Sequence, residues 1–285
     1  MQIKFIIMPV LVSALSACAL ESTSSSDSSS SSALDPNVAP VLKGDWYQPP
    51  AFVTWQWQLS GGLNTSYDVE IYDIDLFDTS ISQIAAIQAI GKRVICYFSA
   101  GSYESWRSDA ANFDSSDYAN TLDGWEDERW LDIRSNNVQS IMKARLDLAV
   151  EKGCDGVEPD NMDAYTNNSG FSLTSSNQLA YNRFIANQAH YRDLSVALKN
   201  DLDQVESLVD YYDFAVNEQC FEYDECDTLA PFTQASKPVL NAEYHDNYVN
   251  DVNQRNSLCT QSINLSFSTL ILPLDLDDSS RYSCL

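Results

Sequence analysis

The sequence predicts an α/β fold with a single (β/α)8 TIM barrel, and two observations carry this prediction. Short β-rich segments alternate with helical or loop-like stretches along the chain, and such alternation is typical of βαβ units with a parallel sheet. Once an export segment and a linker are set aside, about 245 of the residues remain, which is the usual length of one such barrel. Eight strand-like segments in one domain favour a closed barrel over an open sheet.

The predicted elements follow one another regularly. The strand segments are Phe52–Gln58, Val69–Ile74, Arg93–Phe98, Asp155–Glu158, Leu194–Leu198, Asp213–Val216, Pro238–Asn241 and Thr269–Leu272. The clearest helix is Val138–Lys152, in which apolar residues recur on one face. We expect Asn136 or Asn137 to cap its start and Gly153 to end it. Two further segments with helical patterns are Ser175–Tyr191 and Asp246–Ser262.

The first 40 residues predict export. Lys4 precedes the apolar run Phe5–Leu15, which has the form of a signal peptide and is too short to span a membrane. Residues 15–18, Leu-Ser-Ala-Cys, fit a bacterial lipobox, in which residues 1–17 are removed and Cys18 is lipidated. Residues 17–19 also fit ordinary signal peptidase, which would discard Cys18. The serine-rich linker 18–40 looks like a tether and favours the lipobox. We therefore expect a secreted or cell-surface protein, anchored by lipid to a bacterial outer membrane, with its folded domain at 41–285.

The cysteines support an oxidising compartment. With Cys18 set aside, an even number remains, as in proteins with paired cysteines. The candidate disulfides are Cys220–Cys226, which would close one loop, and Cys259–Cys284, which would tie the C-terminal tail to the preceding helix. For Cys96 and Cys154, which lie in or beside predicted core strands, a disulfide and two buried thiols both stay open.

The charge and the motifs narrow the range of partners. The formal net charge is −25, so nucleic acid is not expected, because phosphate binding needs a basic face. The acidity suits a cationic ligand, and it equally suits solubility at high salt. No Cys/His cluster has the spacing of a zinc site, and the acidic run after the second strand lacks the glycine of an EF-hand loop. We expect a monomer without metal or cofactor.

Carboxylates and aromatic residues follow most of the predicted strands. In a (β/α)8 barrel the active site forms at these carboxyl ends. The residues there are Trp55, Trp57, Asp73, Asp75, Tyr97, Tyr103, Glu104, Glu158, Asp160, Asp163, Lys199, Asn200, Asn217, Glu218, Glu243 and Tyr244. A single acidic residue at a strand end commonly caps the next helix, but acids at most of the ends together indicate a site. Glycoside cleavage needs two carboxyl groups, and aromatic faces stack on sugar rings. Lys199 is either a salt-bridge partner or a cation that keeps a neighbouring carboxylate ionised.

These segments resemble glycoside hydrolase family 114, the endo-α-1,4-polygalactosaminidases. The resemblance runs from about Trp55 to Tyr244. Its motifs, in order, are Val94–Glu104, Gly153–Asp163, Leu198–Asn200, Asn217–Cys220 and Asn241–Tyr244. It implies a (β/α)8 barrel and endo-hydrolysis of α-1,4-linked galactosamine polymers. The chain is also similar to the α-galactosidase type of barrel, which implies a nucleophile at Asp160 and an acid/base at Glu218.

The resemblance also implies a cationic amino-sugar polysaccharide as substrate, of the galactosaminogalactan type, cleaved with retention of configuration. The residues expected to bind it are Trp57, Asp73, Asp75, Tyr97, Tyr103, Asp163, Lys199, Glu243 and Tyr244. Two alternatives stay open, namely a hydrolase of another α-glycoside on the same fold and a non-catalytic surface carbohydrate-binding protein. The residues alone do not decide which carboxylate is the nucleophile.

Overall fold

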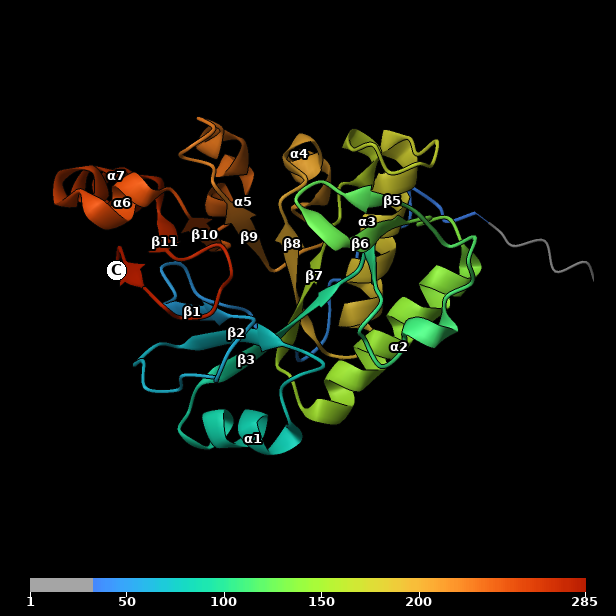
Figure 1. Cartoon of the computed structure of the whole chain (residues 1–285), viewed down its shortest axis with the longest axis horizontal. Coiled ribbons are helices and arrows are strands. Elements are labelled where there is room, and N and C mark those ends of the chain that lie inside the picture. Colours follow the sequence, from blue (N-terminus) through green and yellow to red (C-terminus); the bar gives the residue numbers. More distant parts are fainter. Residues whose placement is uncertain (1–32) are drawn as a thin grey trace, which may run out of the picture. The chain divides into compact units, whose positions relative to one another are not determined.

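Eight parallel strands form the centre of the structure, a computed structural model that describes residues 33–285 (Figure 1). They lie side by side in chain order. They are β1 (Trp55–Gln58), β2 (Ile71–Asp75), β3 (Arg93–Ser99), β7 (Gly156–Asp160), β8 (Ser195–Lys199), β9 (Phe214–Glu218), β10 (Val239–Glu243) and β11 (Phe267–Ile271). Each predicted strand segment overlaps one of them, so the predicted fold class is confirmed. The signal peptide, the lipobox with Cys18 and most of the linker lie outside the described residues.

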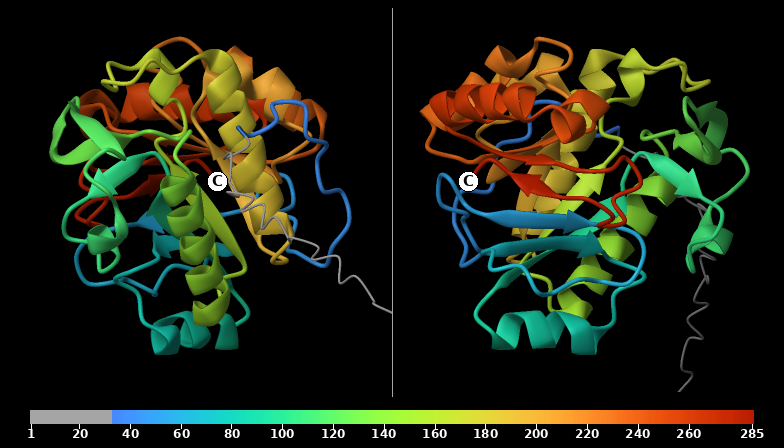
Figure 2. Two further views of the ribbon diagram at one scale, coloured as in Figure 1. Left: turned by 90° about the vertical axis from the view of Figure 1, so that its right-hand side faces the viewer. Right: turned by 60° about the vertical axis from the view of Figure 1, so that its left-hand side comes forward.

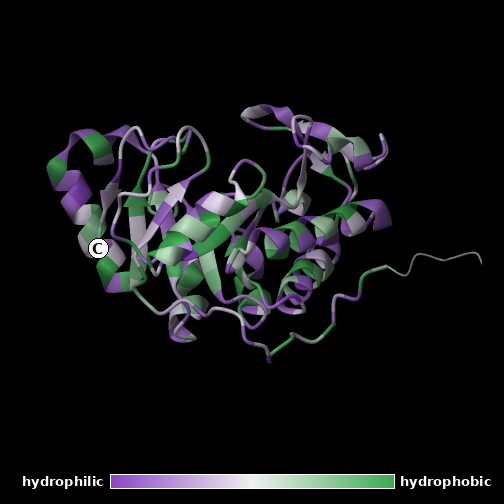
Figure 3. Ribbon diagram, turned by 90° about the horizontal axis from the view of Figure 1, so that it is seen from below, coloured by the Kyte–Doolittle hydropathy of each residue, from purple (hydrophilic) through white to green (hydrophobic). Residues whose placement is uncertain are grey.

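Both faces of the strands are buried, which explains their nearly continuous apolar sequences. On β2 and β3, Ile71 and Ile95 belong to an inner cluster together with Trp55 and Ala197. Their neighbours, such as Tyr72, pack in a larger outer cluster with the helices. The strands are predominantly hydrophobic in Figure 3, whereas hydrophilic residues lie on the outer helices. The core is therefore built in two layers, one inside the curled sheet and one between the sheet and the helices.

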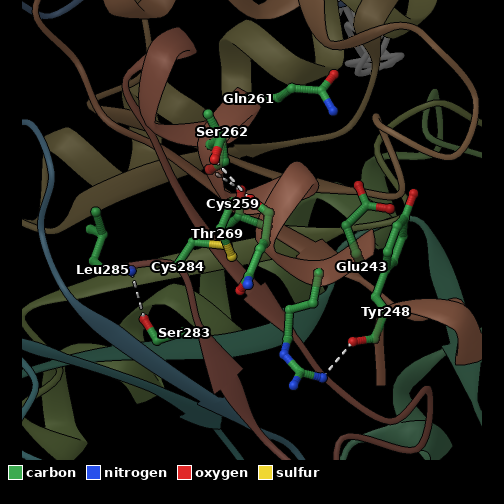
Figure 4. Close-up of a disulfide and its surroundings, with 12 residues drawn as sticks. Glu243, Tyr248, Cys259, Gln261, Ser262, Thr269, Ser283, Cys284 and Leu285 are labelled. Carbon is green, nitrogen blue, oxygen red and sulfur yellow. Dashed lines mark hydrogen bonds between the residues drawn. A yellow bond between two sulfur atoms is a disulfide. The ribbon is translucent and has the colours of Figure 1, made fainter. Parts of the chain in front are cut away.

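The sheet differs from an ideal barrel between its first and last parallel strands. Within residues 33–285 no β-ladder joins β1 to β11; instead β12 (Tyr282–Ser283) pairs antiparallel with β11. Side chains bridge this seam: Trp55 Nε1 donates to the Ser268 carbonyl at 2.8 Å, and Arg281 donates to the Trp55 carbonyl at 2.8 Å. The Cys259–Cys284 disulfide fixes the tail that supplies Arg281 (Figure 4). Closure at this point thus depends on the C-terminal tail.

Helices cover the outer side of the sheet, and Figure 2 shows the first three there. They are α1 (Ile81–Ala89), α2 (Asn136–Lys152), α3 (Ser175–His190), α4 (Val205–Leu208), α5 (Ala230–Gln234), α6 (Asp246–Asn250) and α7 (Val252–Leu265). Gly153 ends α2 as predicted, in the left-handed conformation at φ 84°. The predicted caps of α2 are wrong, because the Ser135 side chain accepts from the backbone of Asn137 and Val138. The predicted helix Asp246–Ser262 is two helices, because Asp251 is extended and caps α7.

A small antiparallel sheet, which the strand prediction did not contain, is inserted between β3 and α2. It consists of β4 (Ser102–Glu104), β5 (Tyr118–Leu122) and β6 (Trp125–Leu131) in the order β4-β6-β5. Short 3-10 turns occupy Ala110–Asn112, Ala164–Thr166, Leu202–Gln204 and Cys226–Leu229. The insertion follows the carboxyl end of β3, so it stands at the edge where the predicted site residues gather.

Three disulfides link the described cysteines. Cys220–Cys226 and Cys259–Cys284 form as predicted, and Cys96–Cys154 also pairs, at a Cα–Cα distance of 6.0 Å. Disulfides of this kind are typical of proteins exported from the cytoplasm. At the start of the described chain, the Val38 and Ala39 carbonyls accept hydrogen bonds from Tyr211 and Asn187, so contacts with the domain begin inside the predicted linker. No helix between residues 33 and 285 is long and apolar enough to cross a membrane.

Candidate active site

A cleft of about 820 Å³ opens at the carboxyl ends of the parallel strands. The predicted site residues that line it are Trp57, Asp75, Tyr97, Asp160, Asp163, Lys199 and Glu218. The predicted substrate-binding residues that do not line it are Asp73, Tyr103, Glu243 and Tyr244. Both predicted catalytic carboxylates therefore face the same open space, Asp160 from the end of β7 and Glu218 from the end of β9.

Lys199 lies at the centre of this arrangement, at the end of β8. Its side chain is 2% exposed, and its Nζ lies 2.9 Å from Glu158 Oε1 and 3.3 Å from both Asp160 Oδ1 and Glu218 Oε2. The ammonium also stands 4.5 Å from the centre of the Trp57 ring. Burial disfavours the ammonium, but the surrounding carboxylates outweigh burial and raise the pKa of Lys199 well above its usual value. Lys199 is thus a fixed cation, and it is both a salt-bridge partner and a counter-charge for its neighbours.

Asp160 is held by donors on several sides. The Tyr97 hydroxyl donates to Asp160 Oδ2 at 3.1 Å, and the backbone N–H of Asn161 donates to Oδ1 at 2.7 Å. Lys199 adds its positive charge at Oδ1. These three contacts fix the orientation of the Asp160 carboxyl group, which lines the cleft.

Glu218 has its own set of donors. The Tyr244 hydroxyl donates to Oε1 at 2.5 Å, and Asn200 Nδ2 donates to Oε2 at 3.2 Å. The Asn200 side chain also accepts from the backbone N–H of Glu218 at 3.0 Å, which orients the end of β9. Because Asp160 Oδ1 and Glu218 Oε2 each lie 3.3 Å from Lys199 Nζ, the two oxygens are separated by at most twice that distance.

Asp73 and Glu158 form a second acidic layer away from the cleft. Both side chains are fully buried, on β2 and β7. Burial, followed by the charge of Glu158, raises the pKa of Asp73 well above its usual value. Burial raises the pKa of Glu158 to about 7, against the opposing effect of Lys199. The position of Asp73 therefore does not suit contact with substrate.

Three other predicted binding residues have structural partners. Asp75 accepts two hydrogen bonds from Arg107, at 2.9 and 2.7 Å, in a buried ion pair. Tyr103 stacks on a tyrosine of β5 with ring centres 4.2 Å apart. Glu243 accepts from the backbone N–H of Phe221 at 3.0 Å and thereby holds the disulfide-closed loop after Glu218. We accordingly assign Tyr103 and Glu243 to the support of the site.

Comparison with known proteins identifies the family. The model of glycoside-hydrolase family GH114 matches residues 36–285. The chain belongs to family GH114. Among solved structures, Aspergillus fumigatus Ega3 in complex with galactosamine is 44% identical, with a TM-score of 0.80, over 85% of this chain and 99% of that chain. The glycoside hydrolase domain of PelA from Pseudomonas aeruginosa shares the fold at 10% identity, with a TM-score of 0.62, over 81% and 98%. No curated protein matched.

The resemblance stated from the motifs is therefore confirmed, and the chain is a glycoside hydrolase. The insertion between β3 and α2 gives this GH114 enzyme cleft residues that sequence reasoning missed. Trp106 and Trp125 line the cleft with 53% and 50% of their surface exposed. The dipeptide Asp123-Gly124 would have revealed the hairpin, because Leu122 pairs with Trp125 across this two-residue turn.

The cleft of the GH114 enzyme also holds acids without a cationic partner. Glu128 on β6 accepts from the Ser102 hydroxyl at 2.5 Å, and Asp163 follows β7; neither forms an ion pair with any described residue. Burial, and next the charge of Asp160, raises the pKa of Asp163 to about 6. Burial also raises the pKa of Glu128. Glu128 and Asp163 thus place two acidic groups in the cleft that have no direct ion-pair partner among the described residues.

Between residues 33 and 285, no group of three or more His, Cys, Asp or Glu side chains is placed to hold a metal ion. The acidic residues of the cleft are instead distributed around Lys199 and along the walls.

Proposed function

We propose that this GH114 enzyme is an endo-acting hydrolase of α-1,4-linked galactosamine-containing polysaccharide, and that Asp160 and Glu218 carry a retaining cleavage. The observation that carries the proposal is the contact of both carboxylates with one buried ammonium, that of Lys199, at the floor of an open acidic cleft. Ega3, which is 44% identical, was solved in complex with galactosamine, and this supports the substrate class.

The first half of the reaction uses the two carboxyl groups together. The Asp160 carboxylate attacks the anomeric carbon and forms a glycosyl ester, while Glu218 gives its proton to the departing oxygen as the glycosidic bond breaks. Asp160 Oδ1 and Glu218 Oε2 lie no more than twice 3.3 Å apart. This limit is compatible with the separation of about 5–5.5 Å in retaining enzymes, and it lies below most of the range of about 6.5–9.5 Å in inverting enzymes.

The second half returns the enzyme to its starting state. Glu218, now a carboxylate, takes a proton from water, and the water oxygen attacks the anomeric carbon. The ester bond to Asp160 breaks, and its carboxylate is restored with the sugar in its original configuration. Tyr97 and the Asn161 N–H are already placed to receive the restored anion.

The walls of the cleft suit a cationic polymer. Protonated amino groups of galactosamine would pair with Glu128 and Asp163, which have no cation of their own in the described chain. Trp106 and Trp125 present exposed indole faces on which sugar rings stack. A cleft open to solvent admits the interior of a chain, which is what endo-cleavage requires.

Cellular placement is part of the same proposal. The lipobox at residues 15–18 would attach the enzyme to a membrane through Cys18 alone, with the serine-rich linker as a tether. We propose that the enzyme acts as a monomer outside the cytoplasm.

Product sizing tests the proposed function. The purified enzyme is incubated with galactosaminogalactan, deacetylated or fully N-acetylated, and the products are sized over time. Oligosaccharides of intermediate length, released early from the deacetylated polymer, are the expected result. Release of single sugars from chain ends would contradict endo-cleavage. Binding without cleavage would instead indicate a carbohydrate-binding protein, and cleavage of another α-glycoside alone would indicate a different substrate.

A further inference from the structure

The buried carboxyl groups of Asp73 and Glu158 lie behind Lys199 and outside the cleft. The two groups are close enough for each to shift the pKa of the other. Neither oxygen of Asp73 accepts a hydrogen bond from a donor in the described chain, and Glu158 Oε2 accepts none either. A carboxylate has no proton to donate, and buried polar atoms without partners are costly. A proton held between the two groups would give one oxygen of each a hydrogen-bond partner.

The charges around Lys199 lead to the same assignment. Its ammonium is the one cation that the described residues place within hydrogen-bonding distance of Glu158, Asp160 and Glu218. If Asp73 were ionised together with Glu158 and Asp160, three anions would share a single cation at a buried site even while Glu218 holds its proton, which is strongly unfavourable. The raised pKa of Asp73, caused by burial and by Glu158, agrees with a protonated Asp73 that donates to a Glu158 carboxylate.

The position of Lys199 fits the movement of charge during retaining hydrolysis. When the ester forms, Asp160 loses its negative charge and Glu218, having given up its proton, gains one. When water attacks, the charge returns from Glu218 to Asp160. Lys199 Nζ lies 3.3 Å from an oxygen of each, so it can compensate the charge in either location without moving. A fixed third anion is needed to keep it there.

We propose that Asp73 and Glu158 are positioning residues, which share one proton and hold Lys199 midway between the two catalytic carboxylates. Glu158 supplies the constant negative charge through its 2.9 Å contact. Asp73 supplies the shared proton. This proton limits the pair to a single negative charge and fixes the Glu158 side chain. The role in turnover rests on the proposed function, whereas the shared proton does not.

Lys199 is surrounded by side chains from several strands of the barrel. The titratable groups that face it are Asp73 on β2, Tyr97 on β3, Glu158 and Asp160 on β7, Glu218 on β9 and Tyr244 after β10. The Trp57 ring of β1 covers it without adding charge. Burial raises the pKa of both tyrosines well above the usual value, so they act as neutral donors. The shared proton thus belongs to the carboxyl pair.

Substitutions at the pair separate positioning from simple structural support. In Glu158→Gln we expect kcat to fall about 100-fold, with KM changed by less than about threefold, because the side chain does not reach the cleft. Asp73→Asn retains a donor toward Glu158, so kcat should stay within about threefold of the unsubstituted enzyme. Asp73→Leu removes the donor, and its kcat should fall by at least about tenfold.

Asp213→Asn is the matched control. It alters a buried acid that lies outside the cleft and that accepts a hydrogen bond from Trp46, and it should lower only the melting temperature.

Infrared spectroscopy tests the shared proton without any substrate. Subtracting the spectrum of Asp73→Asn from that of the full-length enzyme at neutral pH should leave the absorption band of one protonated carboxyl group, because other protonated carboxyl groups, Glu218 included, cancel in the difference. A difference spectrum without the band overturns the proposal. An unchanged kcat in Glu158→Gln overturns it as well. The same holds if Asp73→Asn lowers kcat as much as Asp73→Leu does. If the unsubstituted enzyme fails to cleave galactosaminogalactan, the proposed function fails, while the infrared result still decides whether the pair shares a proton.

Discussion

The hydroxyl of Tyr244 donates a 2.5 Å hydrogen bond to Glu218 Oε1, although Tyr244 does not line the cleft. This contact orients the carboxyl group that must exchange a proton twice in each turnover. We expect Tyr244→Phe to lower kcat about tenfold while KM changes little, because the donor acts on Glu218 and not on the sugar. Tyr191→Phe, at an exposed tyrosine, is the control and should behave like the unsubstituted enzyme. An unchanged kcat in Tyr244→Phe would show that this donor is dispensable.

Acidic residues of the cleft should determine the response to substrate charge. Glu128→Gln and Asp163→Asn should each reduce kcat/KM for deacetylated polymer roughly threefold to thirtyfold, with the reduction diminishing as salt is added. N-acetylated polymer, which lacks the positive charge, should not show this dependence. Glu151→Gln, which changes an exposed acid outside the cleft, is the charge-matched control. Equal losses in all three variants would contradict a specific role for the cleft acids.

The pH dependence should follow Asp163. Its pKa is raised to about 6, mainly by burial and then by Asp160. Asp163 is therefore ionised above about pH 6 and loses its charge as the pH falls through this value, while the amino groups of the substrate stay protonated. The kcat/KM for deacetylated polymer should decrease below about pH 6, and Asp163→Asn should weaken this decrease. A profile identical in the variant and the unsubstituted enzyme would exclude Asp163 as its source.

Sequence reasoning found the strands because they have local signals, whereas the assignment of Asp160 and Glu218 as the catalytic pair rests on the family resemblance and stays a prediction. Apolar β-rich runs mark the strands, and Asp160 and Glu218 immediately end two of them. It did not separate residues that face the cleft from residues that face the core at the same strand ends. Asp73 and Asp75 lie two positions apart on β2, yet Asp73 is fully buried near Glu158, whereas Asp75 forms an ion pair with Arg107. Such a difference depends on partners far away in the chain.

The inserted sheet and the barrel seam were missed for another reason. β4 has only three residues, and β5 and β6 are mostly polar and partly exposed, so these strands lack the apolar runs that identified the barrel strands. Only the Asp123-Gly124 turn marks them. At the seam, Arg281 reaches the carbonyl of Trp55 across most of the chain length, and no local pattern predicts a contact between residues so far apart in sequence.

The Cys259–Cys284 disulfide should stabilise the barrel through this seam. It closes a segment of 25 residues and fixes the tail that carries Arg281. Replacing both cysteines with serine should lower the free energy of unfolding by about 3 kcal/mol and the melting temperature by roughly 5–10 °C. Because neither cysteine lines the cleft, kcat measured well below the melting temperature should be preserved. An unchanged melting temperature would show that the tail stays in place without the covalent link.

The central claim is that Asp160 is the nucleophile of a retaining cleavage with Glu218 as acid/base, and trapping the intermediate tests it most directly. The enzyme with Glu218→Gln is mixed with a galactosaminide whose leaving group needs no proton, and the protein is digested and mapped by mass spectrometry. Attack by Asp160 proceeds, but the base that activates water is missing, so the glycosyl ester should accumulate. We predict one added sugar on the peptide that contains Asp160, and no adduct when Asp160→Asn is combined with the same change. An adduct on another carboxylate, or product of inverted configuration without any adduct, would contradict the account.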